Sequence, residues 1–129
     1  MTIDFLSVED VLEIHADQIE RYGGEHGVRD LGLLESAVQQ PQAGFGGDYL
    51  HADIFEMAAA YAFHIVKNHP FLDGNKRAGA ASALVFLDIN GIELNVPKGG
   101  IYELILAVAK SETEKTEIAN FFRSSAHSG

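Results

Sequence analysis

The chain has 129 residues, a length that suits a single domain with one hydrophobic core. Nine lysines and arginines stand against nineteen acidic residues, and the resulting net charge of −10 repels nucleic acid. The absence of cysteine excludes a disulfide framework and a cysteine-ligated zinc site. The first residues lack the pattern of a signal peptide, and every apolar run is too short to span a bilayer. We therefore expect one cytoplasmic domain over residues 1–129, with no direct contact to nucleic acid or membrane.

The chain opens with two amphipathic helical patterns. Apolar residues spaced three and four apart follow a capping serine, Ser7, and this first pattern, residues 8–22, ends at Gly23-Gly24. Asp30 can cap a second pattern that ends at Pro41, because the residue before a proline avoids helical angles. The sequence therefore predicts two helices before residue 41.

A glycine-containing segment separates these helices from a third. Residues 41–52 hold three glycines and no hydrophobic period, which predicts a mobile loop. Asp53 then caps a helical pattern that runs to about Asn68, and Pro70 breaks it.

The C-terminal half predicts a central helix and two further ones. Residues 78–87 are apolar on nearly every side, as in a helix at the middle of a core, and we place that helix at about Asn75 to Asn90. The other expected elements are a short extended piece over 92–96, helices over 101–110 and from near Thr113, and a disordered tail over 124–129. One short strand cannot make a sheet alone, so the predicted fold class is an all-α bundle around one central helix.

The segment between the third and fourth helical patterns carries most of the chemistry. It reads His69-Pro70-Phe71-Leu72-Asp73-Gly74-Asn75-Lys76-Arg77. Its second half leads into the central helix, so the backbone N–H groups there are among the unpaired donors of a helix N-terminus, which attracts anions. Gly74 lets the backbone approach a ligand, and Lys76 and Arg77 add charge suited to phosphate oxygens.

Two further side chains of this segment suit phosphate chemistry. Asp73 would repel a phosphate directly but is a good ligand for a magnesium ion that bridges phosphates. His69 has an ordinary pKa near neutrality, which suits a general base that takes a proton from an attacking hydroxyl. The segment therefore predicts a site for moving a phosphate group.

Each of these residues also has a purely structural interpretation. Asp73 and Asn75 are common helix-capping types, and Lys76 and Arg77 could form a solvated first turn. Cations at a helix N-terminus oppose the helix dipole, however, and this conflict favours a bound anion. His15 and His64 are interpreted as packing or capping residues.

Two rival motifs do not fit the sequence. His64 and His69 lie five apart and lack the His-Glu-x-x-His spacing of a zinc helix. The run Gly74-Asn75-Lys76-Arg77 lacks the upstream glycine and the following Ser or Thr of a P-loop.

The pattern His69-Pro70-Phe71-x-Asp73-Gly74-Asn75-x-Arg77 resembles the signature loop of the Fic/Doc (Fido) superfamily. Its members are small all-helical proteins with this loop between two core helices, and most transfer AMP from ATP to a hydroxyl side chain of a target protein. The resemblance implies a single Fido domain that uses ATP and Mg²⁺. It also implies that His69 is the base, that Asp73 holds magnesium, and that Gly74, Asn75 and Arg77 bind phosphates.

Two differences from the AMP-transferring members point to the death-on-curing (Doc) branch. Those members have glycine at the position of Lys76 and a second arginine at the position of Ala80. Doc-like sequence also covers residues 20–24, 29–32 and 75–91, while Gly74 in place of an alanine is a small departure toward the Fic pattern.

The Doc branch implies a kinase toxin that phosphorylates a threonine of elongation factor Tu and stops translation. Lys76 would fill the space that AMP-transferring members leave open, so that ATP binds reversed and presents its γ-phosphate. By the same resemblance, residues 41–52 are a flap that docks the target segment as an added strand, or else an ordinary mobile connection.

Regulation by a separate protein follows from two absences. Self-inhibited relatives carry Ser/Thr-x-x-x-Glu-Gly/Asn, whereas Thr113-x-x-x-Glu117 is followed here by Ile118, and Ala80 removes the arginine that such a glutamate engages. The resemblance therefore implies an antitoxin partner, expected to be Phd-like.

Three functions remain open from the sequence. The first is a Doc-type protein kinase toxin, in which Lys76 joins the other motif residues at the site. The second is a Fic-type AMP transferase on another target. The third is a silent protein that binds a nucleotide or a partner, against which the intact pair His69 and Asp73 argues.

Overall fold

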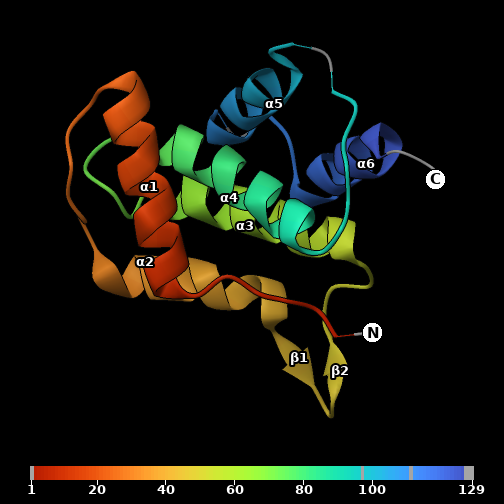
Figure 1. Ribbon diagram of the computed structural model, residues 1–129. Helices are drawn as coiled ribbons and strands as arrows, with labels where there is room; N and C mark the ends of the chain where they lie inside the picture. Colours follow the sequence, from red (N-terminus) through yellow and green to blue (C-terminus); the bar gives the residue numbers. More distant parts are fainter. Residues whose placement is uncertain (1, 97, 111, 127–129) are drawn as a thin grey trace.

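The computed structural model describes residues 2–96, 98–110 and 112–126, and this part of the chain is mostly helical (Figure 1). Its α-helices are α1 (Val8–Tyr22), α2 (Leu31–Gln39), α3 (Ile54–Asn68), α4 (Asn75–Ile89), α5 (Gly100–Ala109) and α6 (Lys115–Ser125). A short 3₁₀ helix, Gln40–Gln42, follows α2. The predicted all-α class is confirmed. Among the described residues, no helix has the length and apolar character needed to cross a membrane.

Local capping explains where the first three long helices begin. The Ser7 hydroxyl accepts a hydrogen bond from the Asp10 N–H, and the Asp10 carboxylate accepts one from the Ser7 N–H in return. The carboxylates of Asp30 and Asp53 likewise accept bonds from the N–H three residues on, at Leu33 and Glu56. These side chains pair backbone N–H groups that the helix itself leaves free.

The predicted loop over residues 41–52 has more structure than expected. It contains a small antiparallel hairpin of β1 (Gly44–Phe45) and β2 (Asp48–Tyr49), in which Gly44 pairs with Tyr49 and Phe45 with Asp48. Gly46 and Gly47 turn the chain with positive φ angles of 61° and 89°, a conformation that favours glycine in a two-residue hairpin turn. The hairpin projects from the helical body in Figure 1.

The centre of the core is α3, so the expectation that α4 is the central apolar helix is not confirmed. The helix α3 packs against α2, α4, α5 and α6, and its residues Met57–Ala62 are all buried. The helix α4 lies antiparallel to it (Figure 1) and leaves Leu84 and Ile89 exposed. The central position of α3 was not predicted because its core face includes several alanines. Their small side chains give a weak hydrophobic signal but allow close packing.

The segment over residues 92–96 pairs with the end of α6. Leu94 forms an isolated antiparallel bridge with Ala126, and the Asn95 N–H donates to the Ser125 carbonyl at 2.6 Å. Ser124 and Ser125, expected in a disordered tail, therefore belong to α6, because this pairing holds the helix end. The rest of the predicted tail, residues 127–129, lies outside the described residues.

Candidate active site

The predicted phosphate-transfer segment forms the turn between α3 and α4. His69 caps α3 in the left-handed conformation (φ 52°, ψ 53°), and its N–H donates to the Ile65 carbonyl. Among the described residues, His69 is the only one other than glycine with a positive φ. The chain therefore turns sharply at this residue, and its side chain is exposed on the pocket described below.

The loop between α1 and α2 holds this turn from outside. The Arg29 guanidinium donates to the carbonyls of Asn68 (3.0 Å) and His69 (2.7 Å). The Arg29 and Asp30 N–H groups both donate to the Pro70 carbonyl. Arg29 thus pairs carbonyls at the C-terminal end of α3, where a cation also complements the helix dipole.

Asn75 braces the segment from inside. Its side-chain oxygen accepts from the Phe71 N–H at 2.9 Å, and its side-chain nitrogen donates to the Phe71 carbonyl at 3.0 Å. The residue is 4% exposed, so both bonds are shielded from water. The predicted contact of Asn75 with a phosphate therefore rests on its backbone N–H rather than on its side chain.

The Asp73 carboxylate is exposed yet fixed in direction. It accepts hydrogen bonds from the N–H of Glu25 (3.1 Å) and of Gly74 (2.8 Å), and these bonds lower its pKa below the ordinary aspartate value. Asp73 is therefore ionised at neutral pH. Gly24 permits this approach: a Cβ placed there would lie 2.7 Å from Asp73 Oδ2 and 3.1 Å from Arg77 Nη2.

His15 of α1 supports the same turn from below. Its ring stacks on Phe71 with centroids 3.7 Å apart, and its Nε2 donates to the Asp73 carbonyl at 2.7 Å. The hydrogen is on Nε2 because a carbonyl can only accept. Burial lowers the pKa of His15, so the ring is neutral at pH 7. The packing role predicted for His15 is confirmed, and its partner is the Asp73 backbone.

The helix α4 presents its N-terminus to the site. Gly74 caps it with φ 75° and no side-chain hydrogen bond, and the first intrahelical bond runs from the Ala78 N–H to the Gly74 carbonyl. The N–H groups of Asn75, Lys76 and Arg77 therefore have no acceptor within the helix. The first turn carries the cations Lys76 and Arg77 and no acidic residue, which is an arrangement that an anion would stabilise.

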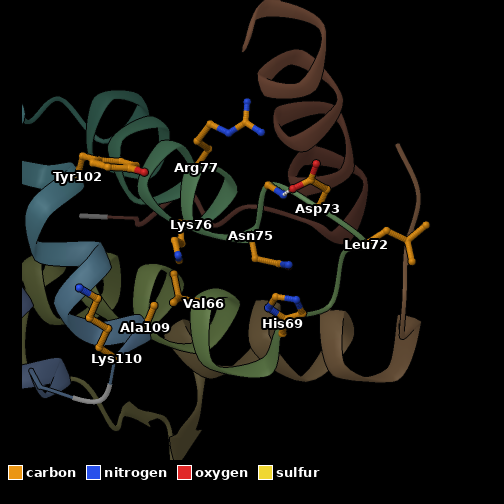
Figure 2. A pocket seen from close by; sticks show the side chains of 11 residues that line it. Val66, His69, Leu72, Asp73, Asn75, Lys76, Arg77, Tyr102, Ala109 and Lys110 are labelled. Carbon is orange, nitrogen blue, oxygen red and sulfur yellow. Dashed lines mark hydrogen bonds between the residues drawn. The ribbon is translucent and has the colours of Figure 1, made fainter. Parts of the chain in front are cut away.

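All six predicted site residues line one pocket of about 590 Å³. Figure 2 shows it between the end of α3, the start of α4 and the helix α5. The six are His69, Asp73, Gly74, Asn75, Lys76 and Arg77. From α5 and its end, Tyr102 and Lys110 line the opposite wall.

The donor set of the pocket fits a magnesium ion bound together with phosphates. Asp73 offers an ionised carboxylate whose oxygens each accept one hydrogen bond from an N–H group, so lone pairs remain for a metal. Among the described residues, no group of three or more His, Cys, Asp and Glu side chains could form a metal cage. One carboxylate plus substrate phosphates is the usual way in which proteins bind Mg²⁺.

Several supporting residues were not predicted from the sequence. Arg29, the Glu25 N–H, Tyr102 and Lys110 reach the site from segments 40 to 50 residues before Asp73, or about 30 to 40 after it. Only the stretch over residues 29–32 carried a signal, as part of the Doc-like sequence.

Comparison of the sequence with known proteins shows which family the chain resembles. The model of the Fic/DOC family matches residues 5–87. The chain is 44% identical over 91 residues to "Toxin Doc" of Mycolicibacterium smegmatis, covering 70% of this chain and 68% of that protein. It is 32% identical over 119 residues to "Protein kinase doc" of Escherichia phage P1, covering 92% of each chain. With the family's match extending over most of the chain and including the whole α3–α4 turn, this protein belongs to the Fic/DOC family.

Proposed function

We propose that this protein is a Doc-type toxin that transfers the γ-phosphoryl group of ATP to a Ser or Thr hydroxyl of a protein. The observation that carries the proposal is one pocket that joins an exposed histidine, an ionised carboxylate and a cationic helix N-terminus. The likeness to proteins named "Toxin Doc" and "Protein kinase doc" supports the same activity.

His69 would act as the general base. Its imidazole lies exposed at the pocket wall, where it can accept the proton of an incoming hydroxyl as the hydroxyl oxygen attacks the γ-phosphorus. The bond from that phosphorus to the bridging oxygen breaks, and ADP is the leaving group. Arg29 and Asn75 hold the turn from both sides, so the imidazole is positioned before the substrate binds.

Charge concentrates an anionic substrate at this pocket. Three of the nine lysines and arginines, Lys76, Arg77 and Lys110, line it in a chain of net charge −10. The free N–H groups of α4 add donors for phosphate oxygens, and Asp73 would hold Mg²⁺. When bound, Mg²⁺ would neutralise phosphate charge and so weaken the repulsion between the γ-phosphate and the attacking hydroxyl oxygen.

Lys76 is proposed to select phosphoryl over AMP transfer. The residue is exposed in the first turn of α4 and its side chain enters the pocket, as Figure 2 shows. If Lys76→Gly leaves γ-phosphate transfer intact and produces no AMP transfer, Lys76 is not the switch.

The proposed biological partners are elongation factor Tu as substrate and a Phd-like antitoxin as inhibitor, both in the cytoplasm. The Doc-like relatives support this pairing, and Thr113-x-x-x-Glu117-Ile118 lacks the Gly or Asn of the internal inhibitory motif. An enzyme of this kind without its own inhibitor needs one from another chain.

The deciding experiment incubates the protein with elongation factor Tu, Mg²⁺ and ATP labelled at the α or the γ phosphate. We expect label from the γ position alone, lost in His69→Ala. Label from the α position would identify an AMP transferase instead. No label from either position, with binding of ATP retained, would support a silent nucleotide-binding protein.

A further inference from the structure

His15 is a buried polar side chain that the proposed mechanism does not use. It belongs to α1, is 4% exposed, and does not line the active-site pocket that His69 and Asp73 share. A polar group is costly to bury unless it forms hydrogen bonds. The bond that His15 forms is to the α3–α4 turn.

The His15 ring contacts this turn at two positions. It stacks on Phe71 with centroids 3.7 Å apart and ring planes inclined by 3°. Its Nε2–H donates to the Asp73 carbonyl at 2.7 Å. Because one rigid ring makes both contacts, it fixes the turn against α1 at Phe71 and at Asp73 together.

The hydrogen bond acts on the peptide unit that also directs the Asp73 carboxylate. The Asp73 carbonyl and the Gly74 N–H belong to one planar peptide group. His15 binds the carbonyl end of this plane, and the N–H end donates to Asp73 Oδ1 at 2.8 Å. A rotation of the plane would break the bond to Oδ1 and leave the carboxylate held only through Oδ2, by the Glu25 N–H.

Glycine makes this plane easy to rotate. Rotation of a peptide plane changes ψ of the residue before it and φ of the residue after it, which is the difference between type I and type II turns. The residue after this plane is Gly74, whose φ is 75°, and glycine adopts either sign of φ about equally well. The bond from His15 to the Asp73 carbonyl opposes the rotation.

We propose that His15 is a positioning residue, which locks the Asp73–Gly74 peptide plane and so holds the Asp73 carboxylate in the direction that binds a divalent metal ion. The inference rests on the proposed function, in which Asp73 is the magnesium ligand. Side chains that orient a metal ligand contribute to metal affinity without touching the metal, and their loss commonly costs about tenfold to a hundredfold in affinity.

Two substitutions separate the hydrogen bond from the ring packing. His15→Phe keeps a ring that can stack on Phe71 and removes the donor. His15→Gln removes the ring and can bring a side-chain amide N–H to the place of Nε2. If packing is the only role of His15, the phenylalanine variant should resemble the wild type and the glutamine variant should be the weaker one.

Isothermal titration calorimetry measures the affinity for the non-hydrolysable β,γ-imido analogue of ATP, in Mn²⁺ and in EDTA. The ratio of the two affinities is the gain that the metal provides. We expect His15→Phe to reduce this gain about tenfold and His15→Gln to recover most of it, with the affinity in EDTA unchanged in both. An unchanged gain in His15→Phe would overturn the inference, and so would a larger loss in His15→Gln than in His15→Phe.

Tyr61→Phe is the matched control. It also removes a buried hydrogen bond between a side chain and the backbone, because the Leu6 N–H donates to Tyr61 Oη at 2.8 Å. Tyr61 does not line the active-site pocket, so the gain from Mn²⁺ should equal that of the wild type. An equal loss in Tyr61→Phe and His15→Phe would mean that general loosening of the fold is the cause, and the inference would be wrong.

Nuclear magnetic resonance of the wild type gives a test that does not depend on how a variant folds. The nitrogen-15 shifts of the His15 ring report which nitrogen carries the hydrogen, and we expect it on Nε2. A hydrogen on Nδ1 alone would place a bare nitrogen against the Asp73 carbonyl, and the inference would fail. In the variants, His15→Phe should move the amide resonance of Gly74, and Tyr61→Phe should leave it in place.

Asp73→Asn tests the proposed function in the same titrations. It removes the proposed metal ligand, so most of the gain from Mn²⁺ should be lost. If Asp73→Asn keeps the full gain, the assignment of the metal to Asp73 fails, and the inference fails with it. If Asp73→Asn loses the gain and His15→Phe keeps it, only the role of His15 is refuted.

Discussion

His69 combines a proposed chemical role with an unfavourable backbone conformation. A left-handed φ of 52° costs a residue with a side chain about 1 kcal/mol relative to glycine. The position after a helix end is the one that glycine most often occupies. The turn therefore keeps a histidine at a cost in stability, which is a common feature of catalytic positions.

We predict that His69→Gly is more stable than His69→Ala by about 1 kcal/mol, because only glycine relieves the left-handed conformation. Urea denaturation monitored by circular dichroism measures the difference. Glu13, exposed within α1, gives the control, since Glu13→Gly should be less stable than Glu13→Ala by a similar amount. Equal stabilities of the two His69 variants would show that the turn carries no such strain.

Arg29 is predicted to be a positioning residue for His69. Arg29→Ala removes both hydrogen bonds to the carbonyls of Asn68 and His69, so kcat should fall about tenfold with the KM for ATP unchanged. Arg29→Lys, which can still reach one carbonyl, should recover part of the rate. Steady-state phosphorylation assays give both constants.

Arg21→Ala serves as its matched control. Arg21 is an exposed arginine that pairs with Asp17 of the same helix and does not line the active-site pocket, so its loss should change neither constant. A rise in the KM for ATP in Arg29→Ala would instead place Arg29 in substrate binding.

The contact between the helices α3 and α6 contains a pair of titratable side chains. Lys115 Nζ lies 3.1 Å from His64 Nε2, so the histidine accepts the bond in its neutral form. Burial, the charge of Lys115 and, to a lesser extent, His51 lower the pKa of His64 to about 4. Burial also lowers the pKa of Lys115, although nearby Glu56 opposes this.

This pair predicts a loss of stability in acid. Above pH 6.5 His64 is neutral in both the folded and the unfolded chain, so it does not make the free energy of unfolding depend on pH. As the pH falls from 6.5 to 4, His64 is protonated in the unfolded chain but remains neutral in the folded chain. The free energy of unfolding therefore decreases. Below pH 4 both states are protonated and the loss stops. After allowance for solvent screening, we expect the effect to be about 1 to 2 kcal/mol.

Urea denaturation at pH 7 and pH 4.5 measures this effect. His64→Gln should lose less stability between the two values than the wild type does. His26→Gln, which alters an exposed histidine paired with Glu20, should lose as much as the wild type. Identical losses in all three proteins would show that His64 titrates normally.

The helices and the predicted site could be read from the sequence because their signals are local. Ser7, Asp30 and Asp53 cap helices within three residues of themselves. The predicted site residues lie within nine consecutive positions, so one turn brings them together. The contributions of Arg29 and Tyr102 could not be read in this way, since they depend on how distant segments pack, and the centrality of α3 depends on which faces its neighbours cover.

For the whole molecule, charge is the dominant long-range property. The net charge is −10, and ion pairs such as Arg21–Asp17 and Arg123–Asp53 join exposed side chains that contribute little to stability. Repulsion among acidic residues therefore opposes folding at low ionic strength. The cations that line the active-site pocket reduce this repulsion only locally.

We predict that the melting temperature rises by a few degrees as sodium chloride is raised from 10 mM to about 150 mM, because screening weakens this repulsion. Differential scanning calorimetry measures the shift. Lys76→Ala should show the same rise, which would separate general screening from binding of an anion in the pocket. A fall in melting temperature with salt would mean that attractive ion pairs dominate.

The contact between α3 and α6 has a consequence for synthesis of the chain. The helix α6 covers one side of α3, and its buried residues Ile118, Ala119 and Phe122 belong to the same core. A ribosome makes α6 last of the described helices, so the nascent chain holds the whole His69 turn while the side of α3 next to α6 is still bare. Folding proceeds from the N-terminus during translation, yet this core closes only when the final helix emerges.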